Sequence, residues 1–217
     1  APIMEAQFIE TAILNILNHQ SLIATKAARI CYAAEGDGIM EFGLRRAQGP
    51  DAGIYGARAA VIGGCAGTSN VLTGQMFDVP VMGTHAHSWI MSFDDEYTAF
   101  YTYARLYPMA CTLLVDTYDT LNSGVPNAIK VFKQMKNEGI ELKNYGIRLD
   151  SGDLAYLSKK ARKMLDDAGF KDATITASND LDEFLIASLK MQGAEITNWG
   201  VGTNLITSKD CPSFGGV

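Results

Sequence analysis

Two of the three histidines lie two residues apart in the segment Gly83–Trp89, whose sequence is GTHAHSW. A histidine can attack a phosphoryl group as a covalent nucleophile when a carboxylate orients its imidazole ring. His87 is a candidate nucleophile, and Asp116 and Asp119 of the later segment DTYDT are candidate partners. A metal-hydrolase site would need further ligands, but the third histidine, His19, falls in a predicted helix near the start of the chain. The sequence therefore favours phosphoryl chemistry over metal-dependent hydrolysis at this segment.

The segment RLDSGD, Arg148–Asp153, places one base and two acids in a short loop. A guanidinium fixed at this position can hold a carboxylate or a phosphate, and carboxylates bind ribose hydroxyls or magnesium. We expect Arg148 and Asp150, which flank the end of a predicted strand, to be functional. Asp153 is better explained as the cap of the following helix.

Two adjacent arginines, Arg45 and Arg46, follow the strand-like sequence IMEFG. Arginines on an exposed loop are commonly solvated, but beside a ligand site they can hold an anion even in an acidic protein. Phe42, at the end of the same predicted strand, can stack on a planar ring or belong to the core. The sequence leaves both alternatives open.

The glycine-rich turn GVGT, Gly200–Thr203, can bind a phosphate through its backbone amides. Thr203 adds a hydroxyl and Lys209 a cation. Ser178 and Asn179 follow the neighbouring predicted strand and resemble the other half of a phosphate cradle. A tight turn explains GVGT alone equally well, but the two clusters together favour a phosphate.

Short apolar runs of strand length alternate with amphipathic segments of helix length, and glycine marks many of the joins. The predicted strands are Ile39–Phe42, Val61–Ala66, Val79–Gly83, Cys111–Val115, Tyr145–Leu149, Ala173–Ala177 and Glu195–Trp199. The predicted helices are Asp51–Ile62, Asn70–Phe77, Asp94–Tyr107, Val125–Asn137, Leu154–Ala168 and Leu181–Met191.

Local signals also predict how these helices begin and end. An amphipathic helix is expected from Pro2 to about Ala33, with a break near His19-Gln20 and a new start at Ser21. Asp94 and Asp180 are expected at helix N-termini. The glycines expected just after helix C-termini are Gly139, Gly169 and Gly193.

An open doubly wound sheet and a closed barrel both fit this alternation. Each predicted strand is followed by a short polar cluster: GLRR, GTSN, GTHAHS, DTYDT, RLDSGD, ASND or GVGT. In an open sheet such clusters concentrate at one switch point, whereas a barrel carries its site around the whole C-terminal rim. We therefore expect an α/β fold with an irregular, TIM-like barrel of about seven βα units.

The composition is that of an acidic globular chain. Its 217 residues are 47% hydrophobic and 19% charged, which is too apolar for a disordered chain. Eighteen basic against 24 acidic residues give a net charge of −6, which argues against non-specific nucleic-acid binding. No apolar run approaches the ~20 residues of a membrane helix, and no secretory signal opens the sequence. The four cysteines form no CxxC pair, so we expect reduced thiols and a cytoplasmic protein.

Seven segments occur in an order that resembles the nicotinate phosphoribosyltransferase family. They are EFGLRRAQGPD, GTSNVL, GTHAHS, DTYDT, RLDSGD, GVGTN and PSFGGV, and the likeness extends from about Ile39 to Val217. The resemblance implies the irregular barrel of the type II phosphoribosyltransferases, in agreement with the barrel expected above. We expect a leading helical segment, residues 1–36, that packs on a catalytic barrel, residues 37–217.

The resemblance implies the reaction of nicotinate with phosphoribosyl pyrophosphate in NAD salvage, giving nicotinate mononucleotide and pyrophosphate. It further implies Mg²⁺, and ATP as a co-substrate that phosphorylates His87, with Asp119 orienting the imidazole and Asp150 contacting the ribose. The nicotinate site implied by the resemblance comprises Arg45, Ser69 and Arg148, with Phe42 stacking on the ring. The implied 5′-phosphate site comprises Ser178, Asn179, Gly202, Thr203 and Lys209. Which acidic residue binds magnesium is left open.

Family members carry an N-terminal domain and a C-terminal portion that this sequence lacks, and a partner subunit completes their nicotinate pocket. We therefore expect a fragment of a longer chain that forms a homodimer with a shared active site. Three alternatives remain: a quinolinate-type enzyme, a nicotinamide-type enzyme, or an inactive phosphosugar-binding fragment. GTHAHS with DTYDT argues against the quinolinate type, which uses no ATP, and Ser69 favours nicotinate over nicotinamide.

Overall fold

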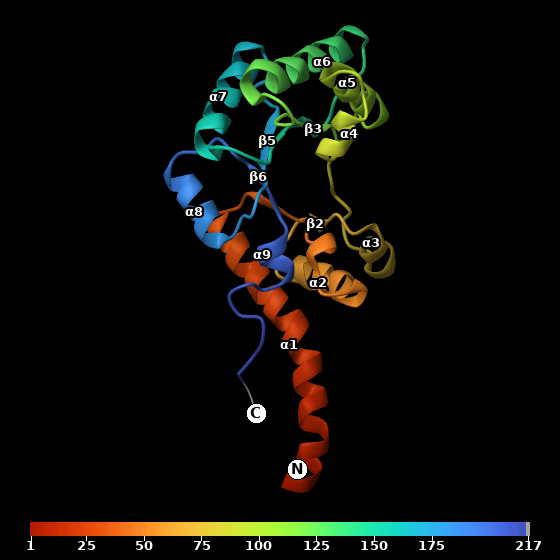
Figure 1. Ribbon diagram of the computed structural model, residues 1–217, viewed down its shortest axis with the longest axis vertical. Coiled ribbons are helices and arrows are strands. Elements are labelled where there is room, and N and C mark those ends of the chain that lie inside the picture. The colour runs from red at the N-terminus through yellow and green to blue at the C-terminus, as the bar shows by residue number, and fades with distance from the viewer. Residues whose placement is uncertain (216–217) are drawn as a thin grey trace. The chain divides into compact units, whose positions relative to one another are not determined.

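The computed structural model describes residues 1–215, and the chain divides into two compact units (Figure 1). Among the described residues, unit 1 contains residues 1–83, 180–187 and 200–215. Unit 2 contains residues 84–179 and 188–199. Helix α8 (Glu183–Met191) and strand β6 (Asn198–Val201) contribute residues to both units. The predicted domain boundary after residue 36 stays a prediction.

Six short strands confirm the α/β class. They are β1 (Gly38–Glu41), β2 (Gly67–Thr68), β3 (Thr112–Leu114), β4 (Gly146–Leu149), β5 (Thr174–Ala177) and β6. Their hydrogen-bonded order is β2-β1-β6-β5-β4-β3, with parallel pairing. Closure into a barrel and the count of about seven βα units are not confirmed by the residues that the structure describes.

Two of the seven predicted strands are wrong. Helix α2 (Pro50–Ile62) continues into the segment predicted as the strand Val61–Ala66. The predicted strand Val79–Gly83 contributes only a single bridge, from Val81 to Thr68. Both errors arise because a largely apolar segment of five or six residues has no periodicity that separates strand from helix or loop.

The centre of unit 2 is built from strands whose side chains are buried. Leu113 of β3 lies opposite Ile147 of β4, which lies opposite Ile175 of β5, and all three are almost fully buried. The helices of this unit are α4 (His87–Met91), α5 (Glu96–Leu106), α6 (Val125–Asn137) and α7 (Leu154–Asp167), with the one-turn π-helix η2 (Thr120–Gly124) before α6. Parallel strands covered by helices are expected to be continuously apolar, as CTLLVD is.

The predicted helix caps are confirmed for α7 and shifted for two other helices. Asp153 accepts a hydrogen bond from the backbone N–H of Tyr156 at 2.9 Å and so caps α7. Asp95, rather than the predicted Asp94, caps α5. Asp182, rather than Asp180, caps α8. The predicted glycines Gly139, Gly169 and Gly193 all have φ between 69° and 90°, the left-handed conformation that ends a helix.

Unit 1 is organised around helix α1 (Ile3–Ala33), which is continuous. The predicted break at His19-Gln20 is wrong, because the helix contains neither proline nor glycine to interrupt it. Helix α2 packs closely on α1: a Cβ added to Gly63 would lie 2.4 Å from the carbonyl oxygen of Ala24. The 3₁₀ turn η1 (Leu44–Arg46) and the helices α3 (Val71–Phe77) and α9 (Thr203–Ile206) complete this unit with the first part of α8.

The two halves of α1 differ in burial. Its buried residues begin at Leu22 and end at Ile30. The N-terminal half exposes a row of apolar side chains: Ile3, Met4, Phe8, Ile9, Ile13, Ile16 and Leu17. Over residues 1–215, no helix combines the length and the apolar character needed to cross a bilayer.

Candidate functional site

Unit 2 gathers polar side chains at the carboxyl ends of three neighbouring strands. Asp116 comes after β3, Asp150 after β4 and Ser178 after β5. Parallel strands that pair in register end at the same edge of the sheet, so these three residues lie close together. Ligands of open α/β sheets bind at this kind of edge.

Arg148, on β4, is held in one orientation by three hydrogen bonds. Its Nε donates to Ser178 Oγ at 2.8 Å, and its Nη1 donates to Thr84 Oγ1 at 2.7 Å. Its Nη2 donates to Asp150 Oδ1 at 3.0 Å, and Ser178 Oγ donates to the same oxygen. A guanidinium fixed in this way is suited to recognise a planar carboxylate.

Asp150 is ionised at neutral pH in this environment. Burial would raise the pKa of its carboxyl group. The hydrogen bonds from Ser178 and Arg148, the positive charge of Arg148 and the contact with His87 outweigh burial and lower this pKa below its usual value. The site therefore presents a carboxylate rather than a carboxylic acid.

His87 begins α4 and turns both ring nitrogens toward oxygen atoms of unit 2. Its Nδ1 lies 3.1 Å from Thr117 Oγ1. Its Nε2 lies 3.4 Å from Asp150 Oδ2 and 3.9 Å from Asp116 Oδ1. Two carboxylates on the Nε2 side favour the tautomer with its proton on Nε2, which leaves Nδ1 as the nitrogen with a free electron pair.

Asp116 is the more buried of these two carboxylates, with a side chain only 1% exposed. Its Oδ2 accepts hydrogen bonds from the backbone N–H of Asp150 at 2.8 Å and from Ser151 Oγ at 2.6 Å. Its Oδ1, the oxygen on the His87 side, has no hydrogen-bond partner among the residues described. A buried carboxylate oxygen without a partner is unusual and indicates a site for a proton donor or a cation.

Asp119 performs a different task in the structure. Its carboxylate accepts a hydrogen bond from the backbone N–H of Asn122 at 2.9 Å and from Asn122 Nδ2 at 3.0 Å, and so caps the turn η2. Within residues 1–215, no contact between Asp119 and His87 is found. Its role in orienting His87 stays a prediction, whereas Asp116 and Asp150 are the carboxylates that lie beside the imidazole.

His85, the other histidine of the pair, is a structural residue. Its Nε2 accepts a hydrogen bond from the backbone N–H of Leu114 at 3.2 Å, and its ring lies edge-on to Tyr103. Burial lowers the pKa of His85 to about 4, so the ring is neutral at pH 7. The interaction joins the loop before His87 to strand β3.

We expect His85 to make unit 2 less stable in mild acid. An unfolded histidine binds its proton near pH 6.5, whereas folded His85 does so only near pH 4. Between these pH values the unfolded state binds more protons than the folded state. The free energy of unfolding therefore decreases as the pH is lowered from 6.5 to 4, by up to about 3 kcal/mol. In His85→Gln, whose side-chain oxygen can replace Nε2 as acceptor, this loss should be much smaller. Urea unfolding at several pH values tests this, and an equal slope in both proteins would contradict it.

The residues predicted to bind nicotinate, apart from Arg148, lie in unit 1. Phe42 follows β1, and its backbone N–H donates to Val201 of β6 at 2.8 Å. Arg45 lies in η1 and is exposed. Ser69 follows β2, and its backbone N–H donates to the carbonyl oxygen of Glu41 at 2.9 Å. Phe42 and Ser69 therefore directly follow the adjacent strands β1 and β2, and Arg45 lies in the turn η1 after β1.

The residues predicted to bind the 5′-phosphate are divided between the units. Ser178 and Asn179 belong to unit 2, where Ser178 is buried and Asn179 is exposed with φ at 93°. Gly202, Thr203 and Lys209 belong to unit 1, where Gly202 precedes α9 and Thr203 begins it. The phosphate roles of all five residues stay predictions.

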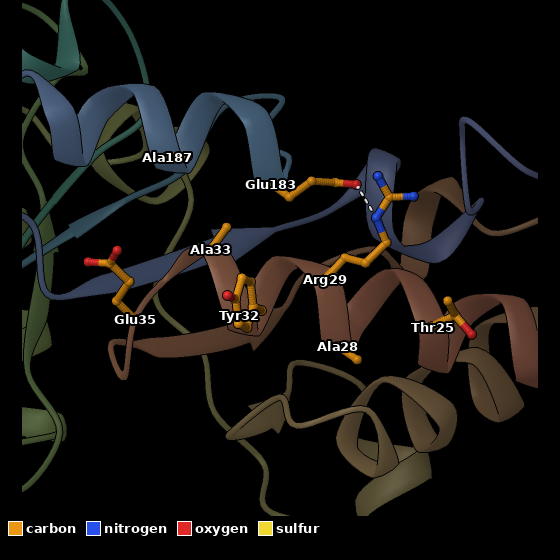
Figure 2. A pocket seen from close by; sticks show the side chains of 8 residues that line it. All are labelled: Thr25, Ala28, Arg29, Tyr32, Ala33, Glu35, Glu183 and Ala187. Carbon is orange, nitrogen blue, oxygen red and sulfur yellow. Dashed lines mark ion pairs between the residues drawn. The ribbon is translucent and has the colours of Figure 1, made fainter.

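A hollow of about 580 Å³ lies in unit 1 between α1 and the start of α8 (Figure 2). Arg29 and Glu183 form an ion pair at its wall, with Nε 3.0 Å from Oε1. The hollow is lined by Thr25, Ala28, Arg29, Tyr32, Ala33, Glu35, Glu183 and Ala187. None of these is a predicted site residue, so the hollow is distinct from the candidate site.

Two threonines of the candidate site are not among the residues predicted from the sequence. Thr84 binds Arg148 and Thr117 binds His87. Both lie inside the segments GTHAHS and DTYDT, directly beside residues that were predicted. A hydroxyl in such a segment carries no sequence signal of its own, because threonine is equally common as a loop or capping residue.

The chain is similar to known proteins of one family. A family model described as the nicotinate phosphoribosyltransferase (NAPRTase) family matches residues 38–211. The chain is 59% identical to nicotinate phosphoribosyltransferase of Bacillus subtilis over 217 residues, which are 100% of this chain and 44% of that protein. Against the Dictyostelium discoideum protein of the same name it is 40% identical over 262 residues, covering 100% of this chain and 44% of the other.

Solved structures show the same likeness. The crystal structure of human nicotinic acid phosphoribosyltransferase matches with a TM-score of 0.82 and 32% identity, covering 93% of this chain and 51% of that chain. The crystal structure of nicotinate-nucleotide pyrophosphorylase from Pyrococcus furiosus matches with a TM-score of 0.76 and 29% identity, covering 91% of this chain and 49% of that chain. The chain thus spans about half the length of the relatives it matches.

Proposed function

The chain belongs to the nicotinate phosphoribosyltransferase family, and from that premise we propose that the complete protein transfers the phosphoribosyl group of phosphoribosyl pyrophosphate to nicotinate. The products are nicotinate mononucleotide and pyrophosphate. The observation that carries the proposal is the cluster at the strand ends of unit 2, where His87, Asp116, Asp150 and Arg148 lie within reach of one another.

The charged side chains of this cluster can stabilise the charges that develop when the bond between ribose and pyrophosphate breaks. Cleaving the bond from the ribose to pyrophosphate builds positive charge on the sugar and negative charge on the leaving group. The ionised carboxylate of Asp150 stabilises a cationic ribose or binds its hydroxyls. Arg148, already fixed by Ser178 and Thr84, binds the carboxylate of nicotinate and so orients the ring nitrogen toward the ribose.

ATP coupling through His87 is part of the proposal. The Nδ1 atom attacks the γ-phosphorus of ATP, the bond to the bridging oxygen breaks, and ADP leaves with the electron pair. The proton on Nε2 stays beside Asp150 and Asp116, which stabilise the charged ring. Hydrolysis of the phosphohistidine then returns His87 and inorganic phosphate. The added charge on His87 between these steps changes the affinity of the site for polyanions.

The same carboxylates fit the Mg²⁺ that phosphoribosyl pyrophosphate and ATP require. Magnesium in such enzymes takes one or two carboxylates and completes its shell with water and substrate phosphates. Asp116, whose Oδ1 is buried without a hydrogen-bond partner among the described residues, and Asp150 would hold it. When bound, the ion would neutralise the negative charge of the leaving pyrophosphate.

The remaining features of the proposal concern the complete protein. Phe42, Arg45 and Ser69 also bind nicotinate, and the residues predicted for the 5′-phosphate hold that group. The strands close into the irregular barrel of the type II phosphoribosyltransferases. The protein acts in the cytoplasm as a homodimer that shares its active sites.

The test is product formation by the complete protein that carries this chain. We expect nicotinate mononucleotide from nicotinate, phosphoribosyl pyrophosphate and Mg²⁺, with faster turnover when ATP is added. Formation of the same product from quinolinate with release of CO₂, without an effect of ATP, would replace the proposal with a quinolinate-type enzyme. Preference for nicotinamide would indicate the amide-specific type. Binding of phosphosugar without turnover would indicate a non-catalytic protein.

We expect Arg45→Ala to weaken the binding of nicotinate far more than that of ATP. The lost guanidinium interaction with a carboxylate is worth about 1.5–3 kcal/mol, or roughly a 10- to 150-fold rise in the Kd for nicotinate. Calorimetric titration of the complete protein measures both ligands. Arg46→Ala, at the neighbouring exposed position of η1, is the matched control and should leave nicotinate binding nearly unchanged. Equal weakening of both ligands by Arg45→Ala would place the nicotinate site elsewhere.

A further inference from the structure

Glu41 is a buried carboxylate that the proposed reaction does not use. It ends strand β1 and has no exposed surface, although glutamate is rarely buried completely. Within the described part of the chain no ion pair compensates its charge. A buried carboxylate without an ion pair needs hydrogen bonds to offset the cost of its burial. The donors of these hydrogen bonds show which segments Glu41 connects.

The side chain of Glu41 joins two loops of unit 1. Its Oε2 accepts a hydrogen bond from Thr68 Oγ1 at 2.6 Å, and its Oε1 accepts one from the backbone N–H of Gly43. The backbone of Glu41 adds a third link, because its carbonyl oxygen accepts from the N–H of Ser69 at 2.9 Å. Glu41 thus fixes the turn after β1 and the turn after β2.

Both turns are tightly constrained around these bonds. Thr68 Oγ1 accepts the backbone N–H of Asn70 at 3.0 Å while it donates to Glu41, so its hydroxyl is used in both directions. A Cβ added to Gly43 would lie 2.4 Å from Ile206 Cβ and 2.8 Å from Glu41 Oε1. Position 43 therefore accepts only glycine, and its N–H points at the carboxylate.

These two turns carry the predicted nicotinate residues of unit 1. Phe42 and Arg45 lie on either side of Gly43, and Ser69 follows Thr68 directly. A shift of either turn would change the spacing between the stacking ring, the guanidinium and the hydroxyl. Such a shift of about 1 Å is enough to reduce catalysis or binding strongly.

We propose that Glu41 is a positioning residue that sets the distance between the two turns of unit 1 that carry Phe42, Arg45 and Ser69. The inference rests on the proposed function and adds to it a residue that touches no substrate. A carboxylate is suited to this task because its two oxygens accept from both turns at once. A glutamine offers one acceptor only, and a leucine offers none.

The test compares Glu41→Gln and Glu41→Leu in the complete protein, with steady-state kinetics for each substrate. We expect the KM for nicotinate to rise by roughly tenfold in Glu41→Gln and further in Glu41→Leu. The reason is that a donor of Gly43 or Thr68 loses its acceptor, so the turns after β1 and β2 are no longer fixed relative to each other. The KM values for phosphoribosyl pyrophosphate and ATP should change by less than about twofold. Thr68→Val, which removes the donor to Oε2, should act in the same direction.

Glu183→Gln is the matched control, because Glu183 is a buried carboxylate of unit 1 that lies in neither turn. It should lower the melting temperature without raising the KM for nicotinate selectively. If the Glu41 variants only lose stability or active fraction, with all KM values unchanged, the positioning role is overturned. If the wild-type protein does not convert nicotinate at all, the proposed function fails, and this outcome is visible before any variant is made.

Discussion

Incubation of the complete protein with γ-labelled ATP and Mg²⁺ is expected to place one labelled phosphate on His87, and His87→Ala is expected to abolish this labelling. The reason is geometric: His87 is the described histidine whose ring lies beside two carboxylates and whose Nδ1 is left unprotonated. A phosphohistidine is labile in acid and stable in base. The stability of the label in acid and in base therefore shows whether the phosphorylated residue is a histidine.

His85→Gln is the matched control for this experiment. His85 lies two residues away but uses its Nε2 to accept from Leu114, so its removal should leave the label in place. An acid-labile phosphate that persists in His87→Ala would show that another residue is the nucleophile. Loss of the label in both variants, with both proteins folded, would mean that the two histidines act together.

Two aspartate variants test whether phosphorylation of His87 depends on Asp116 or on Asp119. Asp116→Asn should slow phosphorylation by about 10- to 100-fold, because it removes the buried charge 3.9 Å from Nε2. Asp119→Asn should have little effect, since asparagine is as good an N-cap as aspartate and η2 keeps its cap. Rates of label incorporation in single-turnover experiments measure both. The opposite ranking would support Asp119 as the orienting carboxylate.

The second large effect concerns the stability of unit 1. Lys26→Met is expected to lower the free energy of unfolding by about 3–5 kcal/mol, because it leaves a buried carboxylate without its principal partner. Lys26 Nζ lies 2.8 Å from Glu183 Oε2 and 2.5 Å from Asp210 Oδ2, and both Lys26 and Glu183 are nearly inaccessible. The ion pair from Arg29 to Glu183 (Figure 2) remains, but Arg29 is half exposed.

Urea unfolding of the purified protein measures this change. The double variant Lys26→Met/Glu183→Gln should recover much of the loss, because it removes the uncompensated charge together with its partner. Lys163→Met is the control: its pair with Asp167 joins two exposed side chains on α7, so no measurable change is expected. A Lys26 variant as stable as the wild type would show that Lys26 is not the principal partner of Glu183.

Local sequence signals predicted much of the fold correctly. The strands near residues 39, 112, 146 and 174 lie within one or two residues of their predicted positions, and α6 matches its predicted range. The cap of α7 at Asp153 and the helix-ending glycines were also recognised. These features depend on the few residues around them, on apolar periodicity, capping and the left-handed conformation, and such information is present in a short window of sequence.

The same local information could not assign neighbouring residues of one loop to their tasks. Asp116 and Asp119 both follow β3, yet one lies beside His87 and the other caps η2. His85 and His87 are two residues apart, yet one is buried against Leu114 and the other is the candidate nucleophile. Which side chain faces the site depends on the strands that lie beside the loop in space, and these come from distant parts of the chain.

Glu41 illustrates the same limit most clearly. In the sequence it is one acidic residue at the end of an apolar run, and nothing near it predicts complete burial. Its partner Gly43 is two residues away in the chain, but its partner Thr68 is not. Thr68 lies beside Glu41 because β1 and β2 pair with these two residues opposite each other. The sequence alone thus identified the family, the alternation of strands and helices and the residues proposed for the site. Their pairing, burial and charge state became evident in three dimensions, because those properties arise from contacts between segments far apart in the chain.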